Sequence, residues 1–127
     1  MYWFCVLIAG LLPYICTLIA KSSMPPSSNR NPREHLANVE GFRARANWAQ
    51  SNSFEAFPLF AASVLSAHIT GVEHDLINAL AMAFVGCRVL YIIVYITDRS
   101  TLRTLIWFGG LACCITLLVK AGLQSSL

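Results

Sequence analysis

Four long apolar runs, separated by three polar segments, dominate the pattern of the chain. They predict helices over about residues 2–20, 35–70, 75–97 and 101–122. Each run is close to the roughly 20 residues that a helix needs to cross the hydrocarbon core of a bilayer, or longer. The connections are short, which favours antiparallel neighbours. We therefore predict an all-α fold, an integral membrane four-helix up-down bundle, with residues 1–127 forming a single domain.

Two details of this pattern allow alternatives. A signal peptide is the competing interpretation of the first run, but Met1 to Phe4 carries no basic side chain, so we predict a retained transmembrane helix. The second helix either continues from Ala37 or restarts near Gly41. Pro58 lies inside it, and a proline there removes a backbone donor, which predicts a kink beside Glu55.

Composition supports a membrane protein and excludes several other classes. Hydrophobic residues make up 57% of the chain and charged residues 12%, against about 25% charged in soluble domains. The net charge of +3 is too small and too scattered to indicate a nucleic-acid partner. The five cysteines lie in apolar runs without a Cys-x-x-Cys pair, and the histidines show no ligand spacing. We expect neither disulfides nor a metal site, and we interpret the cysteines as small apolar filler.

Basic residues predict the orientation in the membrane. Seven of the nine lie in or beside the first and third connections, and these are Lys21, Arg30, Arg33, Arg43, Arg45, Arg99 and Arg103. Lys120 is the only one on the other side, and Arg88 lies within a span. Because positively charged loops remain in the cytoplasm, we expect both termini outside it.

A polar stripe enters the second helix. Arg45, Trp48, Asn52, Glu55 and Leu59 share one helical face. A polar stripe in an apolar helix persists where it faces protein or a wet cavity, so it indicates a functional site. The alternative is an ordinary amphipathic helix start with one snorkelling carboxylate.

The third helix carries a second polar stripe, formed by Arg88, Tyr91 and Tyr95. Arg88 keeps its proton and needs a partner inside the bundle. Glu55 is the only carboxylate deep in another helix, so we predict a Glu55–Arg88 pair, which could also be purely structural. Arg103 joins Arg45 at the cytoplasmic mouth, where such charges suit a small anionic ligand beside an apolar one.

These residues match a known pattern. Asn52-x-x-Glu55-x-x-Pro58 resembles the second-helix signature of the MAPEG family, the membrane-associated proteins in eicosanoid and glutathione metabolism. Arg88-x-x-Tyr91-x-x-x-Tyr95, followed by Arg103, resembles the third-helix pattern of that family. The resemblance covers all four helices. It is nearest to a bacterial branch similar to microsomal glutathione transferases, which implies the bacterial inner membrane.

The resemblance implies a homotrimer that uses glutathione as a co-substrate, held between subunits near the cytoplasmic side. It implies a glutathione transferase or peroxidase that activates the thiol for attack on lipophilic electrophiles or hydroperoxides. Arg103 would be catalytic, lying beside the sulfur, although it could instead be a plain loop charge. The implied glutathione-binding residues are Arg45, Asn52, Glu55, Arg88, Tyr91 and Tyr95.

Two other functions remain open from the sequence. The family also includes a protein that binds lipid mediators without catalysis, so a lipid-binding membrane scaffold of the same fold is the alternative. Small proton-coupled drug exporters also have four helices at this length. Their essential carboxylate lies in the first helix, and here residues 2–20 contain none.

Overall fold

The structure is a computed structural model that describes residues 1–22 and 32–125. All regular structure in these residues is helical. The four long helices are α1 (Tyr2–Ala20), α3 (Phe42–Ile69), α4 (His74–Ile96) and α5 (Ser100–Ser125). A short helix, α2 (Pro32–Ala37), lies in the connection between α1 and α3. Arg30 and the Pro25–Pro26 pair lie outside the described residues.

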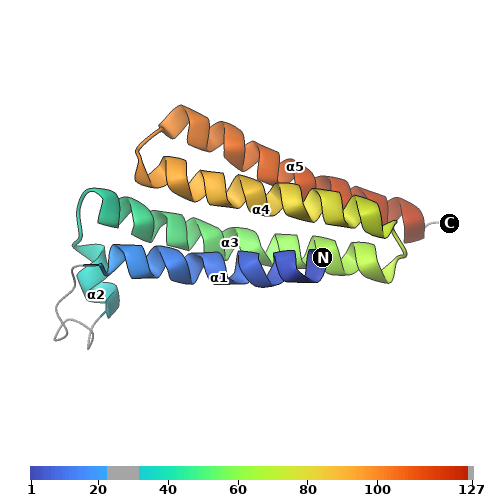
Figure 1. Ribbon diagram of the computed structural model, residues 1–127, viewed down its shortest axis with the longest axis horizontal. Coiled ribbons are helices and arrows are strands. Elements are labelled where there is room, and N and C mark those ends of the chain that lie inside the picture. Colours follow the sequence, from blue (N-terminus) through green and yellow to red (C-terminus); the bar gives the residue numbers. More distant parts are fainter. Residues whose placement is uncertain (23–31, 126–127) are drawn as a thin grey trace.

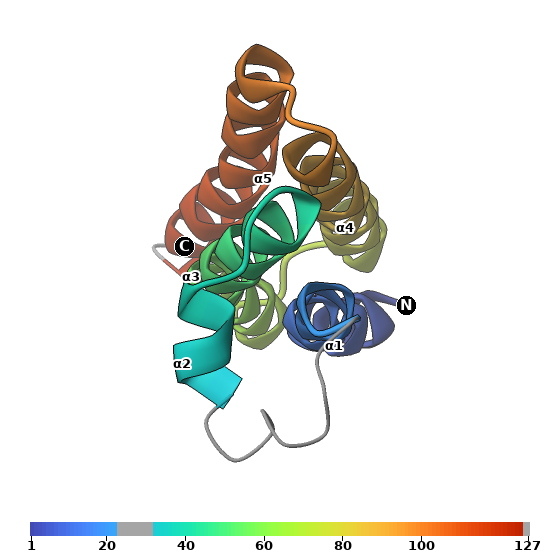
Figure 2. The ribbon, with the colours of Figure 1, turned by 90° about the vertical axis from the view of Figure 1, so that its left-hand side faces the viewer.

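The long helices alternate in direction, so the predicted up-down order is confirmed (Figure 1). The start of α1 and the end of α5 lie toward one end of the bundle, and the α4–α5 turn lies at the other with the start of α3. Helix α3 is central, since it packs against α1, α4 and α5, as the end-on view shows (Figure 2).

Residues with positive φ mark the connections. The predicted second helix is interrupted, and it restarts at Phe42 after Gly41, whose φ is 66°. Of the two alternatives left open by the sequence, the restart is therefore the one adopted. Gly71, with φ 82°, lies in the turn that follows the end of α3. Glycine suits this position because a residue without Cβ enters the left-handed region at little cost.

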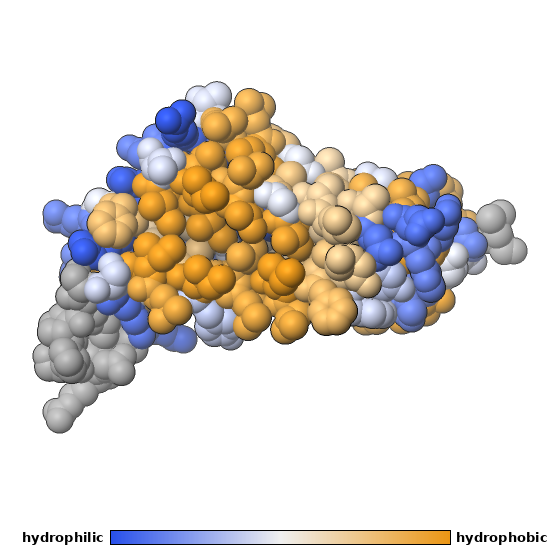
Figure 3. All heavy atoms as spheres, in the orientation of Figure 1, coloured by the Kyte–Doolittle hydropathy of each residue, from blue (hydrophilic) through white to orange (hydrophobic). Residues whose placement is uncertain are grey.

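Three of the four long helices, α1, α4 and α5, are long and apolar enough to cross a membrane. Helix α3 is longer than any of them but carries the polar stripe in its first half, and it remains helical through Pro58. In the space-filling view an apolar surface lies between hydrophilic clusters toward the two ends (Figure 3). This is the surface expected of a bundle that lies in lipid.

Close packing on α3 comes from a stripe of small and apolar side chains. Ala46 and Ala49 are fully buried and allow α1 and α4 to approach. Further along, the Phe60 ring stacks on Phe84 of α4, with centroids 4.0 Å apart and planes 8° from parallel. This stack lies in the largest core cluster, and Phe84 also lines the cavity described below.

All five cysteines are free, and four of them are buried. Cys16 and Cys114 are nearly inaccessible and pack within the apolar clusters. These positions agree with the interpretation of the cysteines as small apolar filler.

Candidate functional site

Arg88 of α4 is the most deeply buried charge in the described part of the chain, with 4% of its surface exposed. Its Nη2 donates to Ser53 Oγ of α3 at 3.1 Å. Its guanidinium carbon lies 4.3 Å from the centre of the Tyr91 ring. Such a cation over an aromatic face is electrostatically favourable in a desolvated place.

The predicted Glu55–Arg88 pair is wrong in this structure. Glu55 is exposed, and no ion pair joins Arg88 to a carboxylate within residues 1–22 and 32–125. The physical reason is helical geometry. Ser53 lies on the buried stripe of α3, and Glu55 comes two residues later, which turns it about 200° around the helix. A neutral hydroxyl on the buried face therefore takes the position that the sequence assigned to the carboxylate.

Beyond Arg88, two aromatic rings and then a second cation follow one another toward the α4–α5 turn. Tyr91 meets Tyr95 edge to face, with centroids 5.6 Å apart. The guanidinium carbon of Arg103, from the second turn of α5, lies 4.4 Å from the Tyr95 ring centre. The three predicted residues Tyr91, Tyr95 and Arg103 are thus brought together, and the Tyr95 ring fixes the half-buried Arg103 side chain against α4.

The start of α3 contributes less to this cluster than expected. Arg45 Nε donates to the carbonyl oxygen of Ile96 at 2.8 Å, which ties the start of α3 to the end of α4. Trp48 is exposed, and its ring centre lies 6.5 Å from that of Tyr95. Arg45 therefore has an internal structural role in this structure, since its guanidinium is held by a backbone carbonyl.

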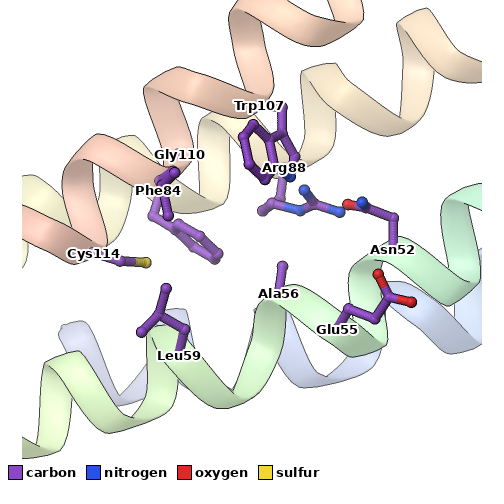
Figure 4. Close-up of a pocket in the computed structure, with 10 residues that line it drawn as sticks. Asn52, Glu55, Ala56, Leu59, Phe84, Arg88, Trp107, Gly110 and Cys114 are labelled. Atoms are coloured by element: carbon purple, nitrogen blue, oxygen red, sulfur yellow. The ribbon is translucent and has the colours of Figure 1, made fainter.

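A cavity of about 170 Å³ lies between α3, α4 and α5. Figure 4 shows Asn52 and Arg88 toward one end of it and Leu59, Phe84 and Cys114 toward the other. Its walls are mostly apolar, with polar groups concentrated at the Arg88 end. This combination suits a lipophilic ligand with one polar group.

A second cavity of about 220 Å³ lies nearer the α4–α5 turn and is more open. Its lining includes Asn52, Tyr91 and Arg103 from the predicted site, together with Thr104 and Trp107. Asn52 and Trp107 line both cavities, so the two are neighbours. The first cavity is mostly apolar with polar groups at the Arg88 end, and the second has a cation, an amide and hydroxyl groups along its wall.

Asn52 has an unsatisfied group at this junction. Its Oδ1 is buried and accepts no hydrogen bond from the described part of the chain. A buried acceptor without a partner costs free energy, and native proteins ordinarily satisfy such a group with a water, an ion or a ligand. Asn52 is therefore suited to accept a hydrogen bond from a bound ligand.

Sequence reasoning missed two residues of the site. Ser53 partners Arg88, and Trp107 of α5 lines both cavities. Ser53 could have been found from its spacing, because it falls with Ala46, Ala49 and Phe60 on one helical stripe. No comparable signal marks Trp107, because a tryptophan near the end of a membrane helix is ordinarily an interfacial anchor.

Replacing Ser53 by alanine is expected to destabilise the bundle by about 1–3 kcal/mol, because the buried Arg88 loses its one hydrogen bond to the described chain. The measurement is unfolding of the detergent-solubilised protein followed by circular dichroism. Ser51→Ala is the matched control, since Ser51 is exposed and donates only to Asn47 of its own helix. Equal stability of the two variants would contradict the assigned role of Ser53.

The chain matches the family model described as the MAPEG family over residues 1–123. No curated protein and no solved structure matches the chain. The matched range contains all four long helices up to Leu123, including every residue of the two cavities.

Proposed function

Because the chain belongs to the MAPEG family, we propose that it is a membrane-bound glutathione transferase or peroxidase. It would activate the glutathione thiol for attack on lipophilic electrophiles or hydroperoxides. The observation that carries this proposal is the position of Arg103. Its half-buried guanidinium lines the second cavity with Asn52 and Tyr91, directly beside the first cavity, whose walls are mostly apolar.

The residues of the second cavity fit glutathione in chemical type. Glutathione is a small peptide with amide N–H donors, carboxylates and a thiol. The Asn52 Oδ1 lacks a donor, and an amide N–H would supply one. Arg103 offers a guanidinium to a carboxylate or a thiolate. We therefore assign glutathione to this cavity, with Tyr91 at its wall and Tyr95 positioning Arg103.

Bound glutathione would supply a thiol, and the thiolate form is the nucleophile. The contribution of the chain is electrostatic. A free thiol has a pKa of about 8.5, and a fixed cation in a poorly hydrated place favours the charged form. Arg103 can act in this way because the Tyr95 ring holds it in place before any ligand arrives.

The exposed face of α3 supports a homotrimer. Glu55 and Trp48 are exposed on the surface of the single chain, and Glu55 lines the first cavity. A carboxylate that faces lipid at the centre of a bilayer costs about 2.5–3.5 kcal/mol on insertion scales, so this face needs a covering of protein. Both cavities are also smaller than the roughly 300 Å³ at which ligand pockets begin. A neighbouring subunit would cover Glu55 and enlarge the site.

Isothermal titration of the detergent-solubilised protein with glutathione tests the proposal. S-methylglutathione serves as the matched ligand, because it keeps the peptide and blocks the thiol. We expect both to bind, and we expect ultraviolet thiolate absorbance near neutral pH with glutathione alone. Protein that binds neither ligand would leave the non-catalytic lipid-binding scaffold as the better account.

We also propose that the chain lies in a bacterial inner membrane with both termini outside the cytoplasm. Lys21, Arg45 and Arg103 gather at the end of the bundle opposite the termini (Figure 1). With Ser22→Cys and Glu73→Cys variants, an impermeant thiol reagent should label only Glu73→Cys in intact cells. Labelling of Ser22→Cys before permeabilisation would reverse the orientation.

A further inference from the structure

Arg45 joins two helices at the end of the bundle where the α4–α5 turn lies. Its Nε donates to the carbonyl oxygen of Ile96, the last residue of α4, at 2.8 Å. Within the described residues one other side-chain hydrogen bond joins α3 to α4, from Arg88 to Ser53. In both views the start of α5 lies farther from α3 than its end does (Figures 1 and 2). The Arg45–Ile96 hydrogen bond, called the latch below, is therefore the outer tie between α3 and the α4–α5 hairpin.

The Ile96 carbonyl depends on Arg45 for its donor. The last carbonyls of a helix have no intrahelical donor and need a cap. The three carbonyls before it, those of residues 93–95, accept the backbone N–H groups of residues 97–99. The Ile96 carbonyl accepts no N–H from the described backbone, and the Arg45 guanidinium supplies the donor instead. Loss of Arg45 would leave the end of α4 with an acceptor that its own turn does not satisfy.

The turn after Ile96 connects the latch to Arg103. It is short, since α4 ends at Ile96 and α5 begins at Ser100. Asp98 in this turn has a φ of 64°, a left-handed conformation that costs free energy in a residue with a Cβ and that the surrounding hydrogen bonds hold. The Arg103 guanidinium also lies over the ring of Tyr95, the residue before Ile96. A shift of Ile96 relative to α3 would therefore move Arg103 with it.

The second cavity lies across the boundary that the latch holds. One of its lining residues, Asn52, belongs to α3, and the others belong to the α4–α5 hairpin, namely Tyr91, Arg103, Thr104 and Trp107. Arg45 precedes Asn52 by seven residues, so it lies on the same face of α3 about two turns, or roughly 10 Å, nearer the end of the bundle. The latch therefore sets how far the hairpin side of this cavity lies from the α3 side.

The hydrogen bond gives Arg45 a different role from the one that its charge suggests. A guanidinium near a cavity often binds an anion directly. Arg45, however, lines neither cavity, and its Nε is engaged by a backbone carbonyl. We propose that Arg45 is a positioning residue that holds the end of α4 on α3 and thereby keeps Arg103 at the second cavity. The latch needs no ligand, and only its effect on the glutathione thiol rests on the proposed function.

Two uncharged replacements separate the hydrogen bond from the charge. Glutamine carries an amide N–H the same number of bonds from the backbone as Nε, so Arg45→Gln keeps a donor and loses the charge. Arg45→Met has the same length and lacks both. Arg43→Met is the matched control, because Arg43 lies two residues away and its Nε donates to the exposed Ser22 hydroxyl, outside the α4–α5 hairpin.

Hydrogen exchange of the detergent-solubilised protein without glutathione tests the latch. The N–H groups of residues 97–99 are hydrogen-bonded, so their exchange reports opening of the turn. Exchange should be about ten-fold faster in Arg45→Met, the effect of one lost hydrogen bond. Arg45→Gln and Arg43→Met should exchange as the wild-type chain does. Equal exchange in Arg45→Met and Arg45→Gln would overturn the latch.

The wild-type chain gives a second measurement, which remains decisive if Arg45→Met fails to assemble. The Nε–H proton of Arg45 is engaged by a half-buried carbonyl, and that of Arg43 by an exposed hydroxyl. In NMR spectra the Arg45 proton should exchange with water more slowly than the Arg43 proton. The same rate for both protons would refute the latch.

Glutathione separates positioning of Arg103 from a general structural role. Arg45→Met should raise the pH at which bound glutathione forms its thiolate toward the free value of about 8.5, and Arg45→Gln should keep the wild-type titration. Equal weakening of glutathione binding by both variants would show a direct charge contact and overturn the proposal, as would faster exchange in Arg45→Met with an unchanged thiolate titration. The exchange difference in a chain that binds no glutathione would refute the transferase and keep the latch.

Discussion

Replacing Arg103 by alanine is expected to lower glutathione-dependent turnover of an aryl halide by about two to three orders of magnitude, as when one charge-stabilising donor is removed from an active site. Arg103 lines the proposed glutathione cavity and is fixed by the Tyr95 ring. No core cluster includes it, so the bundle should still assemble. Steady-state kinetics on the purified variant, with gel filtration to check assembly, makes the measurement.

The reason for this expectation can be tested apart from turnover. Without the cation, the pH at which bound glutathione forms its thiolate should rise toward the value of the free thiol, about 8.5. Arg99→Ala is the matched control, because Arg99 is exposed beside the α4–α5 turn and a solvated charge is screened. If Arg103→Ala and Arg99→Ala kept the same rate and the same thiolate titration, Arg103 would be only a loop charge.

The fold was largely predictable because its main signals are local. Apolar runs gave the four long helices, and Gly41 marked one of the two predicted alternatives for the start of α3. Helical periodicity correctly placed Tyr91 near Tyr95, and the short turn after α4 brought Arg103 to the same place. These relations depend on spacing within one helix or across one short turn.

The partner of Arg88 was not predictable in this way. The sequence offers one carboxylate deep in another helix, and charge complementarity made Glu55 the obvious choice. The rotation of α3 decides otherwise. The small residues Ala46 and Ala49 direct one stripe inward, and Ser53 lies on that stripe while Glu55 does not. Rotation of a helix about its axis depends on packing against several neighbours, which charge alone does not specify.

The cavities were also beyond sequence reasoning, because they depend on how α5 packs against α3 and α4. Trp107 and Gly110 line the first cavity although neither belongs to a recognisable motif. A Cβ at Gly110 would lie 3.6 Å from the Phe84 ring, which is an ordinary contact. The missing side chain of Gly110 is therefore not what creates the space, which comes from the arrangement of the helices. Both cavities therefore follow from the packing of the helices and not from a sequence motif.

Phe60→Ala is expected to destabilise the bundle by about 3–5 kcal/mol, the range for deleting a buried aromatic ring. Phe60 is 0% exposed and stacks on Phe84 at 4.0 Å, so its removal leaves a void that the rigid ring of Phe84 cannot fill. Phe54→Ala is the matched control on the same helix, since Phe54 is 43% exposed and meets only the edge of Tyr14. Unfolding of both variants in detergent gives the difference. A Phe60→Ala variant as stable as Phe54→Ala would show that this aromatic stack does not support the core.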